Sequence, residues 1–127
     1  MSRTIKFAQA GGPEVLEFVE TEVPAPGPHE VRIKVKAIGI NRADSMWRND
    51  KYTESPTFPA GNPPVMSMLW VTGDAEHRKI AVEYVTKALA SGALKPVIDR
   101  TFEFDEMVEV HRYLENSGQF GKIVVTL

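Results

Sequence analysis

The sequence predicts an α+β fold that is rich in β-structure and carries two helices in its second half. Within the first sixty residues, short runs have apolar residues at alternating positions, and turns rich in glycine and proline separate them. Residues 75–91 and 106–116 instead have apolar residues at helical spacing. With 127 residues, of which 43% are apolar, the chain is long enough to bury the core of one domain.

The strands of the first half are predicted at residues 4–8, 15–19 and 30–38. A turn at Gly11-Gly12-Pro13 separates the first two, and prolines give the chain an extended crossing before the third. The segment 30–38 is the clearest of them, because one face would be buried and the other hydrated. Its apolar face consists of Val31, Ile33, Val35 and Ala37, and its basic face of Arg32, Lys34 and Lys36.

The second half is predicted to alternate between strands and helices. Asp74 is expected to cap the first long helix and Gly92 to end it, because a carboxylate accepts helix N–H groups and glycine tolerates the conformation that stops a helix. Asp105 is the expected cap of the second. The predicted elements from residue 41 onward are a short helix at 41–47, a loop at 52–64, a strand at 65–71, a helix at 75–91, an extended segment at 96–102, a helix at 106–116 and a strand at 123–127.

Composition and charge exclude several classes of protein. A formal net charge of −2 argues against nucleic acid as the main partner, because neutralising phosphates requires a basic patch. No apolar run reaches the roughly 18 residues of a membrane span. Lys6 lies where a signal peptide would be apolar, so a cytoplasmic protein without a membrane partner is expected. The absence of cysteine excludes disulfides and thiolate metal ligands.

Several motifs together carry a resemblance to a known family. They are Gly11-Gly12-Pro13-Glu14-Val15-Leu16, Gly39-Ile40-Asn41-Arg42-Ala43-Asp44, Thr72-Gly73-Asp74 and Phe120-Gly121-Lys122-Ile123-Val124-Val125. The chain resembles the zinc-independent NADPH:quinone oxidoreductases of the medium-chain dehydrogenase/reductase superfamily. Residues 1–61 are similar to the N-terminal part of the family's GroES-like catalytic domain. Residues 62–127 are similar to its C-terminal part, and the two parts join near Gly61-Asn62.

The resemblance implies a single truncated catalytic domain over residues 1–127: a GroES-like partial barrel with two C-terminal helices and no Rossmann domain. A Rossmann domain binds the diphosphate of a dinucleotide on a glycine-rich turn that leads into a helix. No G-x-G-x-x-G or A-x-x-G-G-x-G motif occurs in the sequence, and Gly11-Gly12 is followed by Pro13, which has no N–H to donate. Therefore no cofactor is expected to bind tightly, including NADPH, the cofactor of the intact family.

The resemblance also implies roles for residues of the polar loop and the last strand. Asn41 would orient a carboxamide or a substrate carbonyl, and Tyr52 would donate a proton to a developing enolate oxygen, which makes these two the candidate catalytic residues. Trp47 and Arg48 are candidates for the lining of the same cleft. The implied cofactor-binding residues are Asn41, Arg42, Asp44, Ser45 and Lys122.

Most of these residues also have a purely structural interpretation. Asp44 and Ser45 are typical caps of a short helix. Lys122 has the position of an outward-facing strand residue, and Tyr52 is equally compatible with packing on apolar residues of its own loop. A tryptophan such as Trp47 usually fills the core.

A metal site is not predicted. In zinc-dependent relatives a cysteine ligand occupies the position of Asn41, and a Gly-His-Glu motif brings a second ligand; this sequence has neither. The histidines have no spacing that would gather them around one ion, and they are His29, His77 and His111.

Two classes of function remain open. In the first, the chain is a catalytic-domain remnant or deletion form of an NADPH-dependent quinone or activated-alkene oxidoreductase and is inactive alone. In the second, it is a non-catalytic folding or protein-interaction module. Removing an inserted domain would expose apolar surface and strand edges, so the expected partner is a second copy, in a homodimer or a strand-swapped oligomer.

Overall fold

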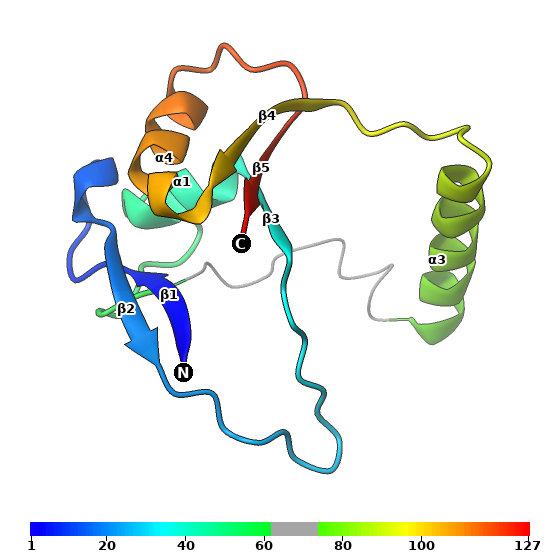
Figure 1. The fold of residues 1–127 in the computed structure, drawn as a ribbon, viewed down its shortest axis with the longest axis horizontal. Coiled ribbons are helices and arrows are strands. Elements are labelled where there is room, and N and C mark those ends of the chain that lie inside the picture. Colours follow the sequence, from blue (N-terminus) through cyan, green and yellow to red (C-terminus); the bar gives the residue numbers. More distant parts are fainter. Residues whose placement is uncertain (62–73) are drawn as a thin grey trace. The chain divides into compact units, whose positions relative to one another are not determined.

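The computed structural model describes residues 1–61 and 74–127. The chain divides into two compact units, whose elements are labelled in Figure 1. The first unit comprises Met1–Pro63 and Ile98–Leu127, and the second, Pro64–Val97, is inserted between these two parts.

The first unit begins with a two-stranded antiparallel sheet. β1 (Ser2–Lys6) pairs with β2 (Glu17–Thr21), with Thr4 opposite Val19. The connection contains the short 3-10 helix η1 (Pro13–Val15), which starts with a proline because the first helical residue needs no N–H partner. The predicted first strand is confirmed but lies at residues 2–6 instead of 4–8, and the second begins later than predicted because η1 takes up its first residue.

A three-stranded sheet forms the centre of the first unit. Its strands are β3 (Ala37–Ile40), β4 (Ile98–Glu103) and β5 (Lys122–Thr126). β5 lies between the other two (Figure 1); it runs antiparallel to β3, with Ile40 opposite Ile123, and parallel to β4. The parallel pairing is possible because α4 (Met107–Glu115) connects β4 to β5.

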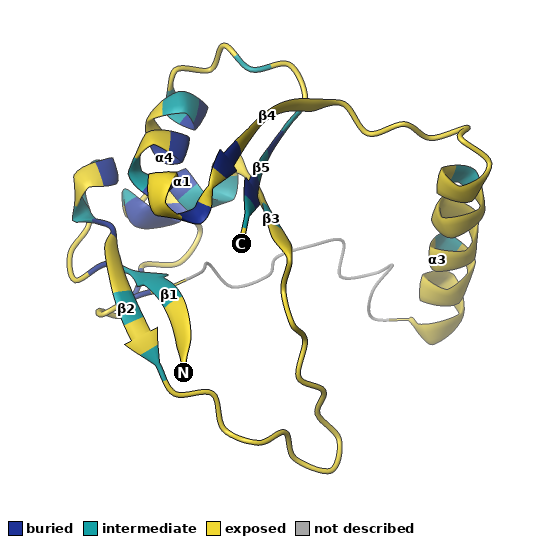
Figure 2. Cartoon of the chain, viewed as in Figure 1, coloured by how far each residue is buried: buried dark blue, intermediate teal, exposed yellow. Residues whose placement is uncertain are grey.

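The hydrophobic core lies between this sheet and the helices α1 (Arg42–Arg48) and α4. In Figure 2 the buried residues concentrate on these helices and on the neighbouring strands. β5 buries Ile123 and Val125, while the residue between them is only half-buried, as expected for a strand with one face in the core. The core residues are Phe7, Leu16, Ile40, Trp47, Ala60, Phe102, Phe104, Met107, Val110, Leu114, Ile123 and Val125.

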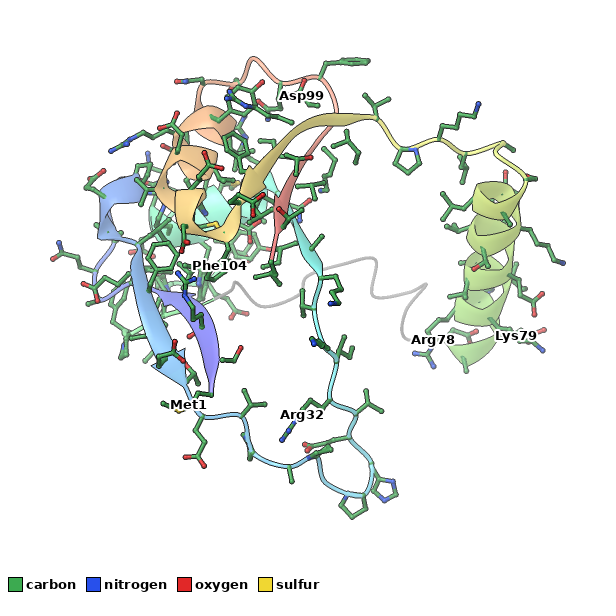
Figure 3. All side chains as sticks on the ribbon, in the orientation of Figure 1. Met1, Arg32, Arg78, Lys79, Asp99 and Phe104 are labelled. Atoms are coloured by element: carbon green, nitrogen blue, oxygen red, sulfur yellow. The ribbon has the colours of Figure 1, made fainter. Side chains whose placement is uncertain are left out.

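Phe104 connects the two sheets (Figure 3). It belongs to the 3-10 helix η2 (Phe104–Glu106), and its ring packs edge-on against Phe18 of β2 with a centroid separation of 5.5 Å. The guanidinium of Arg3 lies 5.3 and 5.1 Å from the centroids of these two rings and pairs with the Asp105 carboxylate. A cation over two aromatic faces and beside a carboxylate holds β1 against η2.

The predicted second helix is confirmed as α4, but its predicted cap is wrong. Asp105 does not cap the helix, because its carboxylate binds Arg3. The turn before α4 is held by Glu106, whose carboxylate accepts the Glu103 N–H at 2.8 Å. Several acidic residues precede this helix. Because Asp105 pairs with Arg3, which is far away in sequence, it is Glu106 whose carboxylate accepts a backbone N–H in this turn.

The predicted strand 30–38 is wrong in its first part. β3 begins at Ala37, and residues 31–36 have no regular secondary structure. The last backbone hydrogen bond between the end of β5 and the segment before β3 runs from the Leu127 N–H to the Lys36 carbonyl, at 3.2 Å. In the described part of the chain no strand lies beside 31–36, so alternation alone does not make a strand there. The apolar residues of this segment are exposed, at 82% for Val31, 75% for Ile33 and 48% for Val35.

The described part of the second unit contains α3 (Ala75–Ala90), which confirms the predicted first long helix. As predicted, Asp74 accepts an N–H of the first turn, that of His77, at 2.8 Å, and Gly92 follows the helix with a φ of 74°. The predicted strand at 65–71, and the turn before Asp74, lie outside the described residues.

The described residues therefore form a mixed fold of helices and two sheets. The GroES-like partial barrel and the single-domain organisation stay predictions. None of the helices in the described ranges is long and apolar enough to cross a bilayer.

Candidate functional site

Two of the predicted site residues meet at one edge of the three-stranded sheet. Because β3 and β5 are antiparallel, the end of β3 lies beside the start of β5. Asn41 follows β3 directly and Lys122 begins β5, and the Lys122 ammonium donates a hydrogen bond to the Asn41 side-chain oxygen. The lysine stem crosses Gly39, where an added Cβ would lie 3.1 Å from Lys122 Cε. Glycine at this position therefore leaves room for the lysine to reach Asn41.

Asp44 is confirmed as a residue that holds the start of α1. Its carboxylate accepts the Asn41 backbone N–H at 2.7 Å, one helical turn before it. Burial raises the pKa of the Asp44 carboxyl, while this N–H and the charge of Lys122 oppose the increase. One of the N–H groups at the start of the helix, that of Asn41, is thus already bonded within the protein.

Ser45 points inward, away from the Asn41–Lys122 corner. It is buried, and its hydroxyl donates to Glu115 Oε1 on α4 at 2.6 Å. The same oxygen accepts the Asn49 side-chain amide at 3.2 Å and the guanidinium of Arg48. Burial opposes ionisation of Glu115, but these donors and the charge of Arg48 outweigh it and lower the carboxyl pKa.

Arg48 is the centre of this network, which the sequence analysis missed. Its side chain is only 1% exposed. The guanidinium donates to the Gly11 carbonyl and the Glu115 carboxylate, and Nε donates to His111 Nδ1 at 3.4 Å. The Arg48 carbonyl in turn accepts the Gly11 N–H at 3.2 Å. One arginine therefore ties α1 to α4 and to the loop that follows β1.

His111 is held neutral beside this arginine. Burial lowers its pKa to about 4, with the positive charge of Arg48 as the second cause. A neutral imidazole accepts the Arg48 N–H with Nδ1, which a protonated ring has no lone pair to do.

The remaining predicted residues lie apart from the corner. The Arg42 guanidinium donates to Ser117 Oγ at 2.8 Å, in the loop between α4 and β5. Tyr52 is half-buried and packs edge-on against Trp47, with ring centroids 6.1 Å apart, and Trp47 itself is buried in the core, as expected. The described contacts bring together Asn41, Asp44 and Lys122, but they do not join Tyr52 to this group.

The sequence contained a signal for the buried network. Ser45, Arg48 and Asn49 have the spacing i, i+3 and i+4, which places three polar side chains on one face of a short helix. That face lies next to Trp47, and a polar stripe beside a buried tryptophan predicts a polar partner in the interior. Glu115 could not be identified as that partner, since it lies on a helix at the other end of the chain.

The described residues contain no group of three or more His, Asp or Glu side chains that could hold a metal ion. A surface cavity is lined by residues 23–26 and 30–32, and none of the predicted site residues belongs to it. The corner at Asn41 and Lys122 is therefore the only place in the described ranges where predicted site residues from two elements contact each other in an exposed position.

The family model for zinc-binding dehydrogenases matches residues 33–125, which is most of the chain. The chain therefore belongs to this family, and the predicted medium-chain dehydrogenase/reductase superfamily is confirmed. The zinc-independent group within it stays a prediction. Its curated relatives include quinone oxidoreductases, which the chain resembles over about half of its length.

The quinone oxidoreductase of Pseudomonas aeruginosa is 44% identical over 61 residues, which are 48% of this chain and 18% of that protein. Quinone oxidoreductase 1 of Escherichia coli is 41% identical over 61 residues, with the same coverage of 48% and 18%. The human quinone oxidoreductase is 37% identical over 60 residues, 46% of this chain and 18% of that protein. The match spans less than a fifth of these relatives, and no solved structure gives a significant match.

Proposed function

We propose that the chain carries the substrate-facing part of a quinone oxidoreductase-like catalytic domain and does not reduce quinones by itself. In this proposal it is a remnant or deletion form of an NADPH-dependent quinone or activated-alkene oxidoreductase, and its strands belong to a GroES-like partial barrel. The support comes from the family match and the similarity to quinone oxidoreductases. The observation that carries the proposal is the exposed corner formed by Asn41 and Lys122.

This corner can present hydrogen-bond donors to a carbonyl group. Because Lys122 donates to the oxygen of the Asn41 amide, the amide NH₂ group is the part of that side chain left to face a substrate. Lys122 adds a positive charge at a half-buried position. An amide N–H and an ammonium both stabilise negative charge that develops on a quinone or enolate oxygen. The third candidate, Tyr52, packs on Trp47, so we assign it to the wall beside the corner.

We propose that the described residues do not hold the diphosphate of NADPH. The Asn41 N–H at the start of α1 is bonded to Asp44, and Gly39, the glycine nearest to this helix, is covered by Lys122. A diphosphate requires free N–H groups on a glycine-rich turn, and each lost charge-assisted hydrogen bond costs about 1.5–3 kcal/mol. We therefore expect NADPH to bind weakly or not at all, and we assign no step to it.

The first test is a cofactor and turnover measurement. NADPH fluorescence is titrated with the chain, and quinone reduction is followed at the NADPH absorbance, with the Pseudomonas aeruginosa relative as the positive control. We expect neither saturable binding nor turnover for this chain. Micromolar binding or turnover clearly above the buffer background would refute the proposed inactivity.

A second test examines the substrate-facing corner directly. Duroquinone, which has no free ring position for lysine to attack, is added to ¹⁵N-labelled protein, and amide chemical shifts are recorded. We expect shifts at Asn41 and neighbouring residues that are lost in Lys122→Met and retained in Lys34→Met. Lys34 is an exposed lysine in the irregular segment before β3, outside the corner, and serves as the control. Unchanged shifts at Asn41 would remove the substrate-facing role.

The alternative is a non-catalytic module that associates with a second copy. It is favoured by the free edges of the two sheets, since β1 and β4 are both outer strands among the described residues. Light scattering over a range of concentrations tests it, and a monomer at every concentration would count against it. For either function we propose a cytoplasmic protein with no nucleic-acid or membrane partner.

A further inference from the structure

We infer that residues 22–36, here called the arm, have a second, closed state in which residues 31–36 pair with the free edge of β2. In the structure the arm leaves β2, turns and returns to β3 without pairing (Figure 1). All of its residues are exposed. The inference concerns backbone pairing alone and does not depend on the proposed function.

In the proposed antiparallel register, residues 19–23 match residues 31–35 on both faces. Apolar or β-branched residues then meet on one face, and acidic residues of the β2 side meet basic residues of the arm on the other. A shift by one residue would place valines opposite charges, so the hydrophobic pattern excludes it. A shift by two residues, with Thr21 opposite Val35 and Glu22 opposite Lys34, keeps both faces matched, and faster oxidation of a cysteine pair at positions 21 and 35 than of the opposed pairs would support that register instead. The pairs in this register are Val19–Val35, Glu20–Lys34, Thr21–Ile33, Glu22–Arg32 and Val23–Val31.

The open arm already holds part of this arrangement. The Arg32 side chain points toward the opposite limb of the arm (Figure 3), where it donates to the carbonyl of Val23 at 3.0 Å and to that of Pro24. The tip is closed by a turn, in which the Glu30 N–H donates to the Gly27 carbonyl at 3.1 Å and the Glu30 side chain accepts the Gly27 N–H at 2.9 Å. The two limbs thus face each other, and the chain already reverses its direction between them.

The prolines of the arm do not prevent the pairing. Proline cannot donate to a strand ladder and is excluded from paired positions in the middle of a sheet. Pro24, Pro26 and Pro28 all lie between Val23 and Val31, within the loop that the closed state leaves unpaired. Every residue of the two pairing segments has an N–H group.

The same register agrees with the core that is already formed. Continued toward β3, it places Lys36 opposite Phe18 and Ile38 opposite Leu16, and Leu16 and Ile38 both belong to the existing hydrophobic cluster. Ile38 and Ile40 lie on the same side of their strand as Arg32 and Lys34, because successive side chains alternate. Pairing therefore keeps Leu16 and Ile38 on one face, next to each other.

Closure would join the two sheets of the first unit into one. Since β3 continues directly from residues 31–36, the strand order would become β1–β2–β3–β5–β4. Asn41 follows β3, so the strand that leads to the proposed corner would gain a second neighbour.

Engineered disulfides test the register. The chain has no cysteine, so two introduced thiols are the only ones present. Thr21→Cys with Ile33→Cys, and Val19→Cys with Val35→Cys, would be directly opposed pairs. The matched controls use the same four positions as diagonals, Thr21→Cys with Val35→Cys and Val19→Cys with Ile33→Cys. Opposed Cβ atoms reach the separation a disulfide requires, while diagonal ones lie too far apart.

We expect the two opposed pairs to oxidise within one chain, seen as a faster-migrating monomer on a non-reducing gel, and the diagonal pairs to oxidise several-fold more slowly. Equal rates in all four variants would overturn the register. Disulfide-linked dimers as the main product would also overturn the inference, because the strand would then be exchanged between two copies.

Charge reversal provides an independent readout in the Thr21→Cys, Ile33→Cys background. Lys34→Glu is expected to slow oxidation about two- to five-fold, since a facing charge pair contributes roughly 0.2–1 kcal/mol. Glu20→Lys also affects Arg3 on β1, which lies opposite Glu20, so the decisive quantity is the coupling between positions 20 and 34. The double variant should oxidise faster than the two single effects together predict, and purely additive effects would contradict the pairing.

Discussion

The two faces of α1 are held by different kinds of contact. On its outer side, Asn41 and Lys122 meet at an exposed corner and Arg42 binds Ser117. On its inner side, Ser45 and Arg48 bind Glu115 in the interior. Water competes for the outer contacts and is largely excluded from the inner ones. We therefore expect the inner face to carry most of the stability of α1, and the outer face to tolerate substitution without loss of the fold.

The largest expected effect comes from replacing the buried arginine. Arg48→Met leaves Glu115 without its cation and the Gly11 carbonyl without its donor. Removing one partner of a buried ion pair costs about 3–5 kcal/mol, and we expect the lower end because the Glu115 side chain is 31% exposed. Urea unfolding measures the loss. The control is Arg42→Met on the outer face, for which a change below about 0.5 kcal/mol is expected; equal losses would erase the difference between the faces.

A smaller effect is expected from the titration of His111. Its pKa is about 4 in the folded chain and near 6.5 when unfolded, so the unfolded state binds more protons between these values. Stability is then complete above about pH 6.5 and falls as the pH drops, by about 2 kcal/mol between about pH 7 and pH 5. His111→Gln should remove this slope, and His29→Gln, in the exposed arm, should keep it. The measurement is urea unfolding at several pH values, and an unchanged slope in His111→Gln would exclude the assignment.

The smallest expected effect lies on the outer face. Gly39→Ala places a Cβ 3.1 Å from Lys122 Cε, and the flexible lysine can move away. We expect a stability change within about 0.5 kcal/mol, together with a clear shift of the Asn41 side-chain amide resonance as the Lys122 bond is lost. Gly118→Ala is the matched control, since an added Cβ there meets no atom within 4 Å. An unshifted Asn41 resonance in Gly39→Ala would show that the glycine does not govern the corner.

Local sequence patterns predicted the helices well. Asp74 and Gly92 bound α3 as expected, because capping and helix termination depend on residues next to one another in the chain. The short helix after Asn41 was predicted from the same kind of signal, and Asp44 does hold its first turn. For these elements the cause lies within a few residues, and the sequence displays it.

The misses have causes that lie far away in the sequence. Asp105 was predicted as a cap, yet Arg3 at the other end of the chain binds it. Residues 31–36 alternate like a strand, but β5 offers no backbone partner beyond Lys36. The burial of Arg48 depends on Glu115, and nothing near Arg48 in the sequence identifies that carboxylate. The meeting of Asn41 and Lys122, in contrast, was within reach, because the family resemblance named both residues.

The insertion of the second unit into the first has a thermodynamic consequence. The first unit is closed by contacts between Met1–Pro63 and Ile98–Leu127, so the connection between these parts acts as one large loop. The entropy lost on closing a loop grows only with the logarithm of its length, by about 0.6 kcal/mol for each doubling. A shorter connection, or one that contains a whole folded domain, would therefore change the free energy of folding of the first unit only slightly. This connection is thus a position at which segments can be inserted or removed, in evolution or by engineering.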